Sequence, residues 1–464
     1  MEFADFEIRA WKKTARCVQV LVHSSPAGEM DAPVDVDVAS GRLTALANVD
    51  DVFGNLGPGT NLRSAKLGAE LASILLPPPA AQLLDASLRQ LTRGDGLRIR
   101  LCLDSALSAL PWELMFRSES RRGGGMLDGF LVLDPRISLV RGATRIFQES
   151  RLVADRLRLV FAGAFAAGGE DQLKVRDEYA GLAKAIEPIA NLVWLEPCTA
   201  SVGSAIETAL ARPAAIFHYA GHVEIEGARA YLVKEFDAGS ERMYADTVSK
   251  LLEGAASRLA VFTACNSAHP SFITPLLTAG CQAIIGGHGT YPVTTAVAFS
   301  ERLYGFLAVG LSLDRAVIAA RQHLIEQGRE WGWEHCEWGR MAVFMPVREP
   351  VLFPRPEDNG VGVQRDSVLA AHNKTMDRRA LRQAMVRAFS SDDLRLLCAD
   401  IEDALRAAGI NEPVDLDVIG GSGKGLEIQI LELVGYLDRR NWYGHLDAAV
   451  RAARPDLVRV LSRD

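Results

Sequence analysis

The chain has 464 residues, of which 48% are hydrophobic and 23% charged, and its formal net charge is −7 at pH 7. This composition is typical of a globular protein with a large core, and the length corresponds to two or three domains of about 150 residues. The negative charge argues against nucleic acid or an anionic membrane as the main partner.

The seven cysteines lie far apart in the sequence, and no two have the CxxC spacing. An odd number of scattered cysteines indicates free thiols in a reducing compartment rather than a disulfide framework. The apolar segment at 17–22 is too short for the core of a signal peptide, and no stretch approaches the roughly 20 apolar residues of a membrane span. We therefore expect a cytoplasmic protein.

Residues 1–150 are expected to form a mixed α/β region. A strand is predicted at 17–23. Apolar and polar residues alternate over 34–40 and 97–104, which predicts two further strands with one buried face each. The segment LPWELM follows at 110–115.

Residues 151–350 have a different pattern, in which short apolar runs alternate with helical segments. Strands are predicted at 157–163, 191–195, 215–221, 258–264, 281–287 and 341–347, and helices at 177–187, 201–211, 245–254, 271–280, 294–308 and 313–327. Such alternation favours a largely parallel sheet with helices on both faces.

Proline and glycine are frequent over 348–362, which predicts a linker, placed at 351–376, before a helical region at 377–464. Helices are expected at 390–409, 426–440 and 442–453. In the first of these, the apolar residues that recur at intervals of three and four are Leu394, Leu397, Cys398, Ile401 and Leu405. They form one helix face, with Ser390 or Ser391 as N-cap, so a small helical bundle is predicted.

Two strands of the α/β region end in reactive side chains: AIFHYAGH ends at His222, and LAVFTAC ends at Cys265. The carboxyl ends of neighbouring parallel strands meet at one edge of a sheet, so the two residues converge if these two strands are neighbours. A cysteine nucleophile needs a base or cationic partner, usually an imidazole. The backbone N–H groups of Gly221 and Cys265 could then stabilise an oxyanion. Taken singly, either side chain is more often a core residue.

These strand ends, together with LPWELM, resemble the CHAT domain, a caspase-like cysteine protease group related to separases. The motifs HYAGH (218–222) and VFTACNSA (261–268) carry the resemblance, and the segments at 276–293 and 299–321 follow the order of the family. The resemblance covers roughly residues 90–350. It implies that 1–150 is an inactive α/β half and that 151–350 is the caspase-like catalytic half.

The resemblance implies that His222 is the general base or cationic partner and Cys265 the nucleophile, with His218 in a structural role. Two positions depart from the family pattern: Val223 replaces the usual glycine, and Thr294 and Thr295 stand where an aspartate is common. That aspartate could select a basic residue before the scissile bond. The alternative reading is therefore a catalytically inactive scaffold. The acidic residues weighed as substitutes for the aspartate are Glu224, Glu226, Asp237 and Asp246.

The helical region resembles effector-associated domain 1, a death-domain-like adaptor module of bacterial conflict systems. The stretches at 381–397 and 426–456, and their order, carry this resemblance. It implies pairing with a similar module on an adaptor or sensor protein. A plain dimerisation or capping bundle is the alternative, and self-association of the chain stays open.

No cofactor or metal is expected. The segment GGSGKG at 420–425 lacks the spacing of a phosphate-binding loop and is expected to connect helices. Histidine and cysteine are also zinc ligands, but nothing in the sequence arranges four of them as a tetrahedron. The residues considered for such a site are His218, His222, Cys265, His269 and His288. The predicted partners are a protein or peptide substrate and an adaptor or sensor, with neither nucleic acid nor a membrane.

Overall fold

The computed structural model describes most of the chain. The described residues are 3–48, 53, 60–92, 95–118, 127–142, 157–163, 170–198, 204–233, 242–290, 292–308, 310–330, 336–347, 352, 385, 389–407, 413–416, 426–439, 446, 449, 450 and 453. The chain divides into two compact units, Met1–Val361 and Gly362–Asp464, and each is described by itself.

The first unit is built on one mixed sheet of 13 strands. The strands are β1 (Phe3–Thr14), β2 (Cys17–Ser24), β3 (Val34–Asp37), β4 (Gly96–Leu103), β5 (Ile137–Arg141), β6 (Leu157–Gly163), β7 (Val193–Cys198), β8 (Ile216–Glu226), β9 (Arg229–Val233), β10 (Arg242–Tyr244), β11 (Leu259–Cys265), β12 (Ala283–Gly287) and β13 (Met341–Phe344). Their order is β10-β9-β8-β11-β12-β13-β5-β4-β1-β2-β3, with β6 between β7 and the first part of β8.

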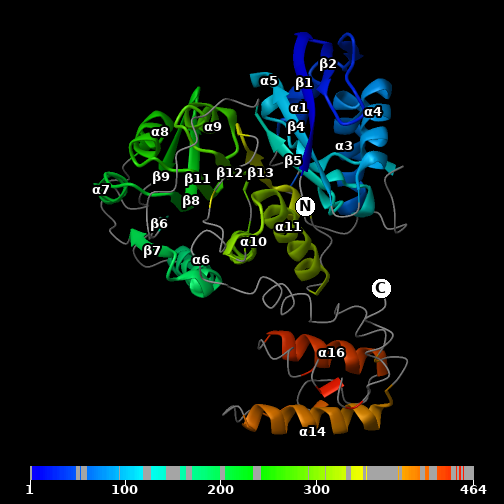
Figure 1. Ribbon diagram of the computed structural model, residues 1–464, viewed down its shortest axis with the longest axis vertical. Coiled ribbons are helices and arrows are strands. Elements are labelled where there is room, and N and C mark those ends of the chain that lie inside the picture. Colours follow the sequence, from blue (N-terminus) through cyan, green and yellow to red (C-terminus); the bar gives the residue numbers. More distant parts are fainter. Residues whose placement is uncertain are drawn as a thin grey trace. The chain divides into compact units, whose positions relative to one another are not determined.

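Helices cover both faces of this sheet (Figure 1). The α-helices of the first unit are α1 (Arg42–Leu46), α3 (Thr60–Leu75), α4 (Pro78–Gln90), α5 (Ser105–Ser108), α6 (Glu170–Ile186), α7 (Ser204–Leu210), α8 (Ala245–Gly254), α9 (Pro270–Leu276), α10 (Val293–Ala308) and α11 (Leu313–Glu330). Helices α6, α10 and α11 contribute to one hydrophobic core, and α7, α8 and α9 contribute to a second core on the other face. The predicted α/β class, with a largely parallel central sheet flanked by helices, is confirmed.

Strand β8 is longer than the predicted 215–221. It continues to Glu226, and its last five residues pair with β9 in antiparallel orientation. Strands β9 and β10 were not predicted from the sequence. A signal for this extension was present, because Val223 and Ile225 alternate with polar residues over 222–226.

Strand β4 corrects a second expectation. The alternation in 97–104 predicted one exposed face, but Arg98 and Arg100 are 3% and 0% exposed. Arg98 pairs with Asp314, at 2.7 Å between Nη2 and Oδ2, and Arg100 donates to the carbonyls of Met345 and Val347. Partners from distant segments therefore allow charged side chains to lie inside. Strand β1 and helices α3 and α4 were also not predicted.

The second unit contains α14 (Ser391–Ala407) and α16 (Leu426–Arg439), with a core of its own. All five apolar residues predicted to form one face of the first helix are buried. Ser390 is the cap: its Oγ accepts from the backbone of Asp393, and its own N–H donates to the Asp393 carboxylate. The loop predicted at 420–425 and most of the predicted linker and third helix lie outside the described residues.

Within the parts of the chain that the structure describes, no helix has both the length and the apolar character needed to cross a bilayer.

Candidate active site

His222 and Cys265 lie side by side on neighbouring strands. Strands β8 and β11 are parallel, and their register runs from Ile216 opposite Leu259 to His222 opposite Cys265. Side chains alternate between the faces of a strand, and register partners share a face, so His222 and Cys265 project to the same side. Neighbouring strands are about 4.8 Å apart, which brings the imidazole and the thiol within reach of each other.

Strands β8 and β11 are therefore neighbours, which is the condition for the two residues to converge, although β9, β10 and α8 lie between them in the chain. The pairing of β8 with β11 ends at these two residues, and both are half-buried. Reactive side chains at the end of a parallel ladder are supported by the core below and reached from outside.

Four of the other six thiols, those of Cys198, Cys281, Cys336 and Cys398, are buried, whereas Cys265, like Cys17 and Cys102, is half-buried. Burial raises the pKa of five cysteines and keeps them in the poorly nucleophilic protonated form. The pKa is raised to about 12 for Cys102, Cys281 and Cys398 and to about 11 for Cys336, and it is also raised for Cys198. Cys265 is half-buried, in register with an imidazole.

Gly221 precedes the histidine on β8 and has a steric requirement of its own. A Cβ atom there would lie 2.7 Å from the hydroxyl oxygen and 2.9 Å from Cζ of Tyr219. Tyr219 lies on the opposite face from His222 and donates a hydrogen bond to the carbonyl of Val233 at 2.7 Å. The ring occupies the space of the missing side chain, so the glycine is needed for packing whether or not its N–H group binds an oxyanion.

Val223, which departs from the family pattern, does not face the candidate site. Its side chain is 2% exposed and belongs to the hydrophobic core on the face opposite His222. Its register partner on β9 is Leu232, which is also buried. A valine here therefore extends the core beneath the β8–β9 hairpin.

The chain turns sharply after Cys265, through the 266–268 turn. Asn266 has a φ of +57°, a left-handed conformation that asparagine adopts more readily than most residues. The side chain of Ser267 is fully buried, with Oγ 2.6 Å from the carbonyl of Ala264 and 3.0 Å from that of Phe262. The same oxygen accepts the N–H of Gly287 at 2.7 Å. Ser267 thus anchors the turn both to β11 and to β12.

His218 lies one layer deeper on the face of the candidate dyad and is fully buried. Its Nδ1 is 3.1 Å from the hydroxyl of Tyr304, and its Nε2 is 3.0 Å from Glu178 and 3.1 Å from Thr263. Ser300 also donates to Glu178. These contacts join β8 and β11 to α6 and α10. They agree with the structural role expected for His218.

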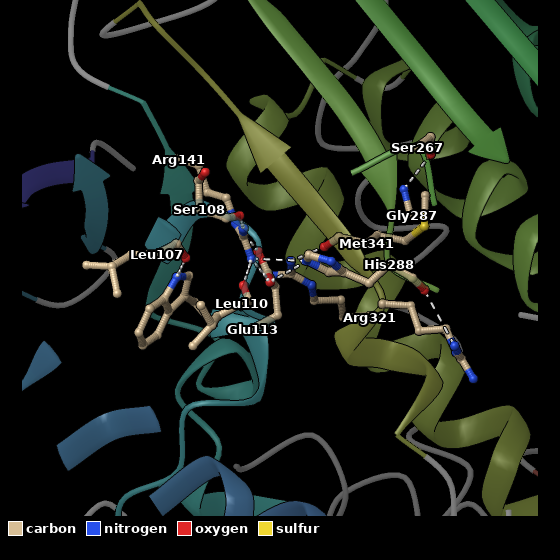
Figure 2. Close-up of polar contacts among 12 residues, drawn as sticks. Leu107, Ser108, Leu110, Glu113, Arg141, Ser267, Gly287, His288, Arg321 and Met341 are labelled. Carbon is tan, nitrogen blue, oxygen red and sulfur yellow. Dashed lines mark hydrogen bonds and ion pairs between the residues drawn. The ribbon is translucent and has the colours of Figure 1, made fainter. Parts of the chain in front are cut away.

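A second buried polar cluster joins the two halves of the sheet (Figure 2). Glu113, from LPWELM, is fully buried and pairs with Arg141 at 2.5 Å between Oε2 and Nη2. His288 Nε2 lies 3.1 Å from Glu113 Oε2 and 3.0 Å from Arg141 Nη2. Burial alone would raise the pKa of Glu113, but the Arg141 charge and the His288 hydrogen bond outweigh it and lower this pKa to about 2.

The acidic residues considered for substrate selection are engaged elsewhere or lie outside the described residues. Glu224 accepts the hydroxyl of Tyr231, and Glu226 pairs with Arg242, both at 2.5 Å. Asp246 is in the first turn of α8, where a carboxylate favours the helix dipole. Asp237 is not among the described residues.

A buried carboxylate does lie near the threonines that replace the family aspartate. Thr295 Oγ1 is 3.4 Å from Glu337 Oε2. Arg340 Nε lies 2.6 Å from the same oxygen, and its Nη2 is 3.0 Å from the other carboxylate oxygen. The charge of Glu337 is therefore balanced inside the protein.

Among the described residues, no group of three or more histidine, cysteine, aspartate or glutamate side chains is arranged to hold a metal ion. The five histidine and cysteine residues weighed for zinc are instead divided among the candidate dyad, the two buried polar clusters and a helix cap. The cap is His269, whose Nδ1 accepts the N–H of Ser271 at the start of α9.

Several features around the candidate dyad were not predicted from the sequence: Tyr219, Asn266, Ser267 and the Glu113–His288 contact. For Asn266 and Ser267 a weak signal existed, since asparagine and serine favour turns. Glu113 and His288 are 175 residues apart, and no local pattern connects them.

The family model described as the CHAT domain matches residues 65–349, more than half of the chain. The chain therefore belongs to the CHAT domain family. No curated protein matches the sequence significantly.

Two solved structures resemble the fold. The crystal structure of the Arg-specific cysteine proteinase gingipain R has a TM-score of 0.38 and 13% sequence identity, over 66% of this chain and 75% of gingipain. The Saccharomyces cerevisiae separase–securin complex has a TM-score of 0.32 and 14% identity, over 57% of this chain and 17% of the matched chain.

Proposed function

We propose that the protein is a caspase-like cysteine endopeptidase that uses a His222–Cys265 dyad. The observation that carries this proposal is the register of β8 and β11, which pairs the two residues on one face at the end of the parallel ladder. Membership of the CHAT family supports a protease fold.

In the proposed reaction, the Cys265 thiol transfers its proton to His222, and the thiolate attacks the carbonyl carbon of the scissile bond. The backbone N–H groups of Gly221 and Cys265 stabilise the oxyanion that forms. The His222 imidazolium then protonates the leaving amine, and an acyl-enzyme remains on the sulfur. Water, deprotonated by His222, hydrolyses this thioester and regenerates the thiol.

Reaction with a peptidyl acyloxymethyl ketone tests the dyad. We expect mass spectrometry to find the adduct on Cys265, and the Cys265→Ala chain to remain unlabelled. His222→Ala should slow labelling by roughly 10²-fold or more, the usual contribution of a positioned acid–base group. Cys17→Ala is the matched control, because Cys17 is also half-buried but lies in the inactive half.

The alternative is an inert scaffold that works through its helical unit. A scaffold gives no labelling that depends on both His222 and Cys265. Labelling of Cys265 at an unchanged rate in His222→Ala would contradict the dyad. Cleavage of a peptide library by the wild-type chain, and its absence in Cys265→Ala, would then give the residue preference.

We further propose that the helical region at 377–464 recruits the protease to an adaptor or sensor protein in a bacterial defence or programmed-death pathway. Supporting this, residues 362–464 form a separate compact unit with its own buried core. The test compares the whole chain with a variant truncated after Val361, each mixed with a neighbouring-gene product that carries a similar module. Binding by the truncated variant would contradict recruitment through this region.

A further inference from the structure

The segment Gly287–Gly289, which begins at the last residue of β12, lies against the 266–268 turn. Gly287 N–H donates to Ser267 Oγ at 2.7 Å, Ala268 N–H donates to the carbonyl of Gly287 at 2.9 Å, and Asn266 N–H donates to that of Gly289 at 3.0 Å. Three hydrogen bonds thus connect this segment to the residues that follow Cys265.

The segment has only its first residue in the sheet, where Gly287 pairs with Met341 of β13. It contains two glycines, and Gly289 has a φ of +59°, a left-handed conformation. Glycine has more backbone freedom than any other residue, so a conformation of this segment must be held by contacts made outside it.

His288 supplies those contacts. Its side chain is 3% exposed and reaches Glu113 and Arg141 (Figure 2). Its backbone N–H also donates to the carbonyl of Arg340 at 2.9 Å. Arg141 is fixed in turn by the carbonyls of Ser108 and Leu110, at 2.8 and 2.9 Å. The side chain of His288 is therefore bound to a rigid part of the N-terminal half.

The surroundings of the His288 imidazole hold it in its neutral form. Burial lowers the pKa of His288, and the charges of Arg141 and Arg340 lower it further, against the opposing effect of Glu113. The imidazole is therefore neutral near pH 7. Its Nε2 either donates to Glu113 or accepts from Arg141, and either hydrogen bond ties the segment to the N-terminal half.

We propose that His288 is a positioning residue through which the N-terminal half of the CHAT unit holds the nucleophile in place. The route runs from Glu113 and Arg141 through His288 to the 266–268 turn. The inference rests on the proposed function, since it assigns to the inactive half a role in the chemistry of Cys265. The expected consequence of losing His288 is a slower attack by Cys265 with unchanged substrate binding.

The test measures labelling of the full chain by the peptidyl acyloxymethyl ketone, separating the maximal rate constant from the half-saturating concentration. A misplaced reacting group costs up to about 10²-fold, so His288→Ala should lower the maximal rate constant about tenfold or more. The half-saturating concentration should change by less than about twofold. His288→Gln, whose amide can replace the Nε2 contact, should restore most of the rate.

The matched control is Asp314→Asn, which weakens the buried pair of Asp314 and Arg98. That pair also joins the two halves, with side chains 1% and 3% exposed, but Asp314 lies on α11 rather than beside the 266–268 turn. We expect the control to lower the free energy of unfolding without slowing the labelling step. Ser267→Ala is the second test variant, because it removes the other anchor of the same route and should slow labelling as His288→Ala does.

Hydrogen exchange supplies a readout that is independent of activity. Amides in a peptide spanning 262–270 should exchange faster in His288→Ala than in the wild-type chain, and should be unchanged in Asp314→Asn. Labelling of His288→Ala at the wild-type rate, or an equal loss in Asp314→Asn, overturns the inference while leaving the dyad in place. A wild-type chain that resists labelling overturns the proposed function and the inference together.

Discussion

Two pairs of neighbouring parallel strands in one sheet differ in how far their polar side chains are enclosed. Strands β4 and β5 contain Arg98, Arg100 and Arg141, all at most 3% exposed and all bound to carboxylates or carbonyls. Strands β8 and β11 pair as far as His222 and Cys265, which are both half-buried. The same scaffold thus supports enclosed ion pairs in one half and the candidate dyad in the other.

The difference shows how burial decides what a polar group can do. A charge that is fully enclosed must be fully paired, and its pairing fixes it in one state. A half-buried histidine and cysteine keep access to substrate and to protons, because only one side of each is enclosed. Three predictions test whether stability and reactivity divide between the strand pairs in this way.

The largest expected effect is on stability, from Arg141→Met. The substitution leaves Glu113 in the core without its ion-pair partner, and removing one partner of a buried pair costs about 3–5 kcal/mol. Chemical denaturation of the full chain, with tryptophan fluorescence as readout, measures this change. His222→Ala in the same assay should cost less than about 1 kcal/mol, as substitutions outside the core usually do. An equal loss of unfolding free energy in the two variants would contradict the proposed difference between the two pairs of strands.

A smaller effect is expected from Gly221→Ala, at the boundary between core and site. The added Cβ would lie within 3.1 Å of three atoms of the Tyr219 ring and hydroxyl. Overpacking of this kind costs about 1–3 kcal/mol, and here it should also displace His222 and slow labelling of Cys265. In a Tyr219→Phe background the closest of the three contacts is gone, so the same substitution should cost less. An unchanged cost in that background would mean that the ring is not what excludes a side chain.

The third prediction concerns pH. The folded-state pKa of His288 is lowered from 6.5, so the unfolded chain takes up a proton before the folded chain does. Acid therefore favours unfolding, and this part of the stability is lost as the pH falls below 6.5. Glu113, with its pKa lowered from 4.5 to about 2, adds a loss between those two values. Each pKa unit corresponds to about 1.4 kcal/mol.

His288→Gln should remove the loss of stability below pH 6.5, which is due to His288, and keep the loss below pH 4.5, which is due to Glu113. Denaturation midpoints measured between pH 7 and about pH 3 check this, since both groups titrate or begin to titrate in that interval. His269 also has a pKa lowered by burial, so His269→Gln serves as the comparison at a site outside the Glu113 cluster. A wild-type chain as stable at pH 5 as at pH 7 would contradict the buried neutral state of His288.

Much of the caspase-like half could be predicted from the sequence. Helix α8 has the predicted bounds, and β6, β11 and β12 differ from the predicted strands by at most two residues. In the second unit the apolar face of α14 is as predicted. These features depend on side chains a few residues apart, so their periodicity is present in the sequence itself.

The N-terminal half was predicted less well, for a physical reason. The arginines of β4 have the alternation of an exposed face, but they are buried against partners that include Asp314, Met345 and Val347. These partners are more than 200 residues away. A pattern within one strand contains no information about them.

The sequence by itself determined that two apolar runs lead to His222 and Cys265, and that a helical region follows the α/β part. Only the tertiary structure decided that β8 and β11 are neighbours in register, that Val223 faces the opposite core, and that His288 meets Glu113. Strand ends and helix faces are set by local periodicity. Strand register, the face of the sheet to which a side chain projects, and pairing between distant residues are set by how the whole sheet packs. Each buried polar group needs a hydrogen-bond partner, and that partner can come from any part of the chain.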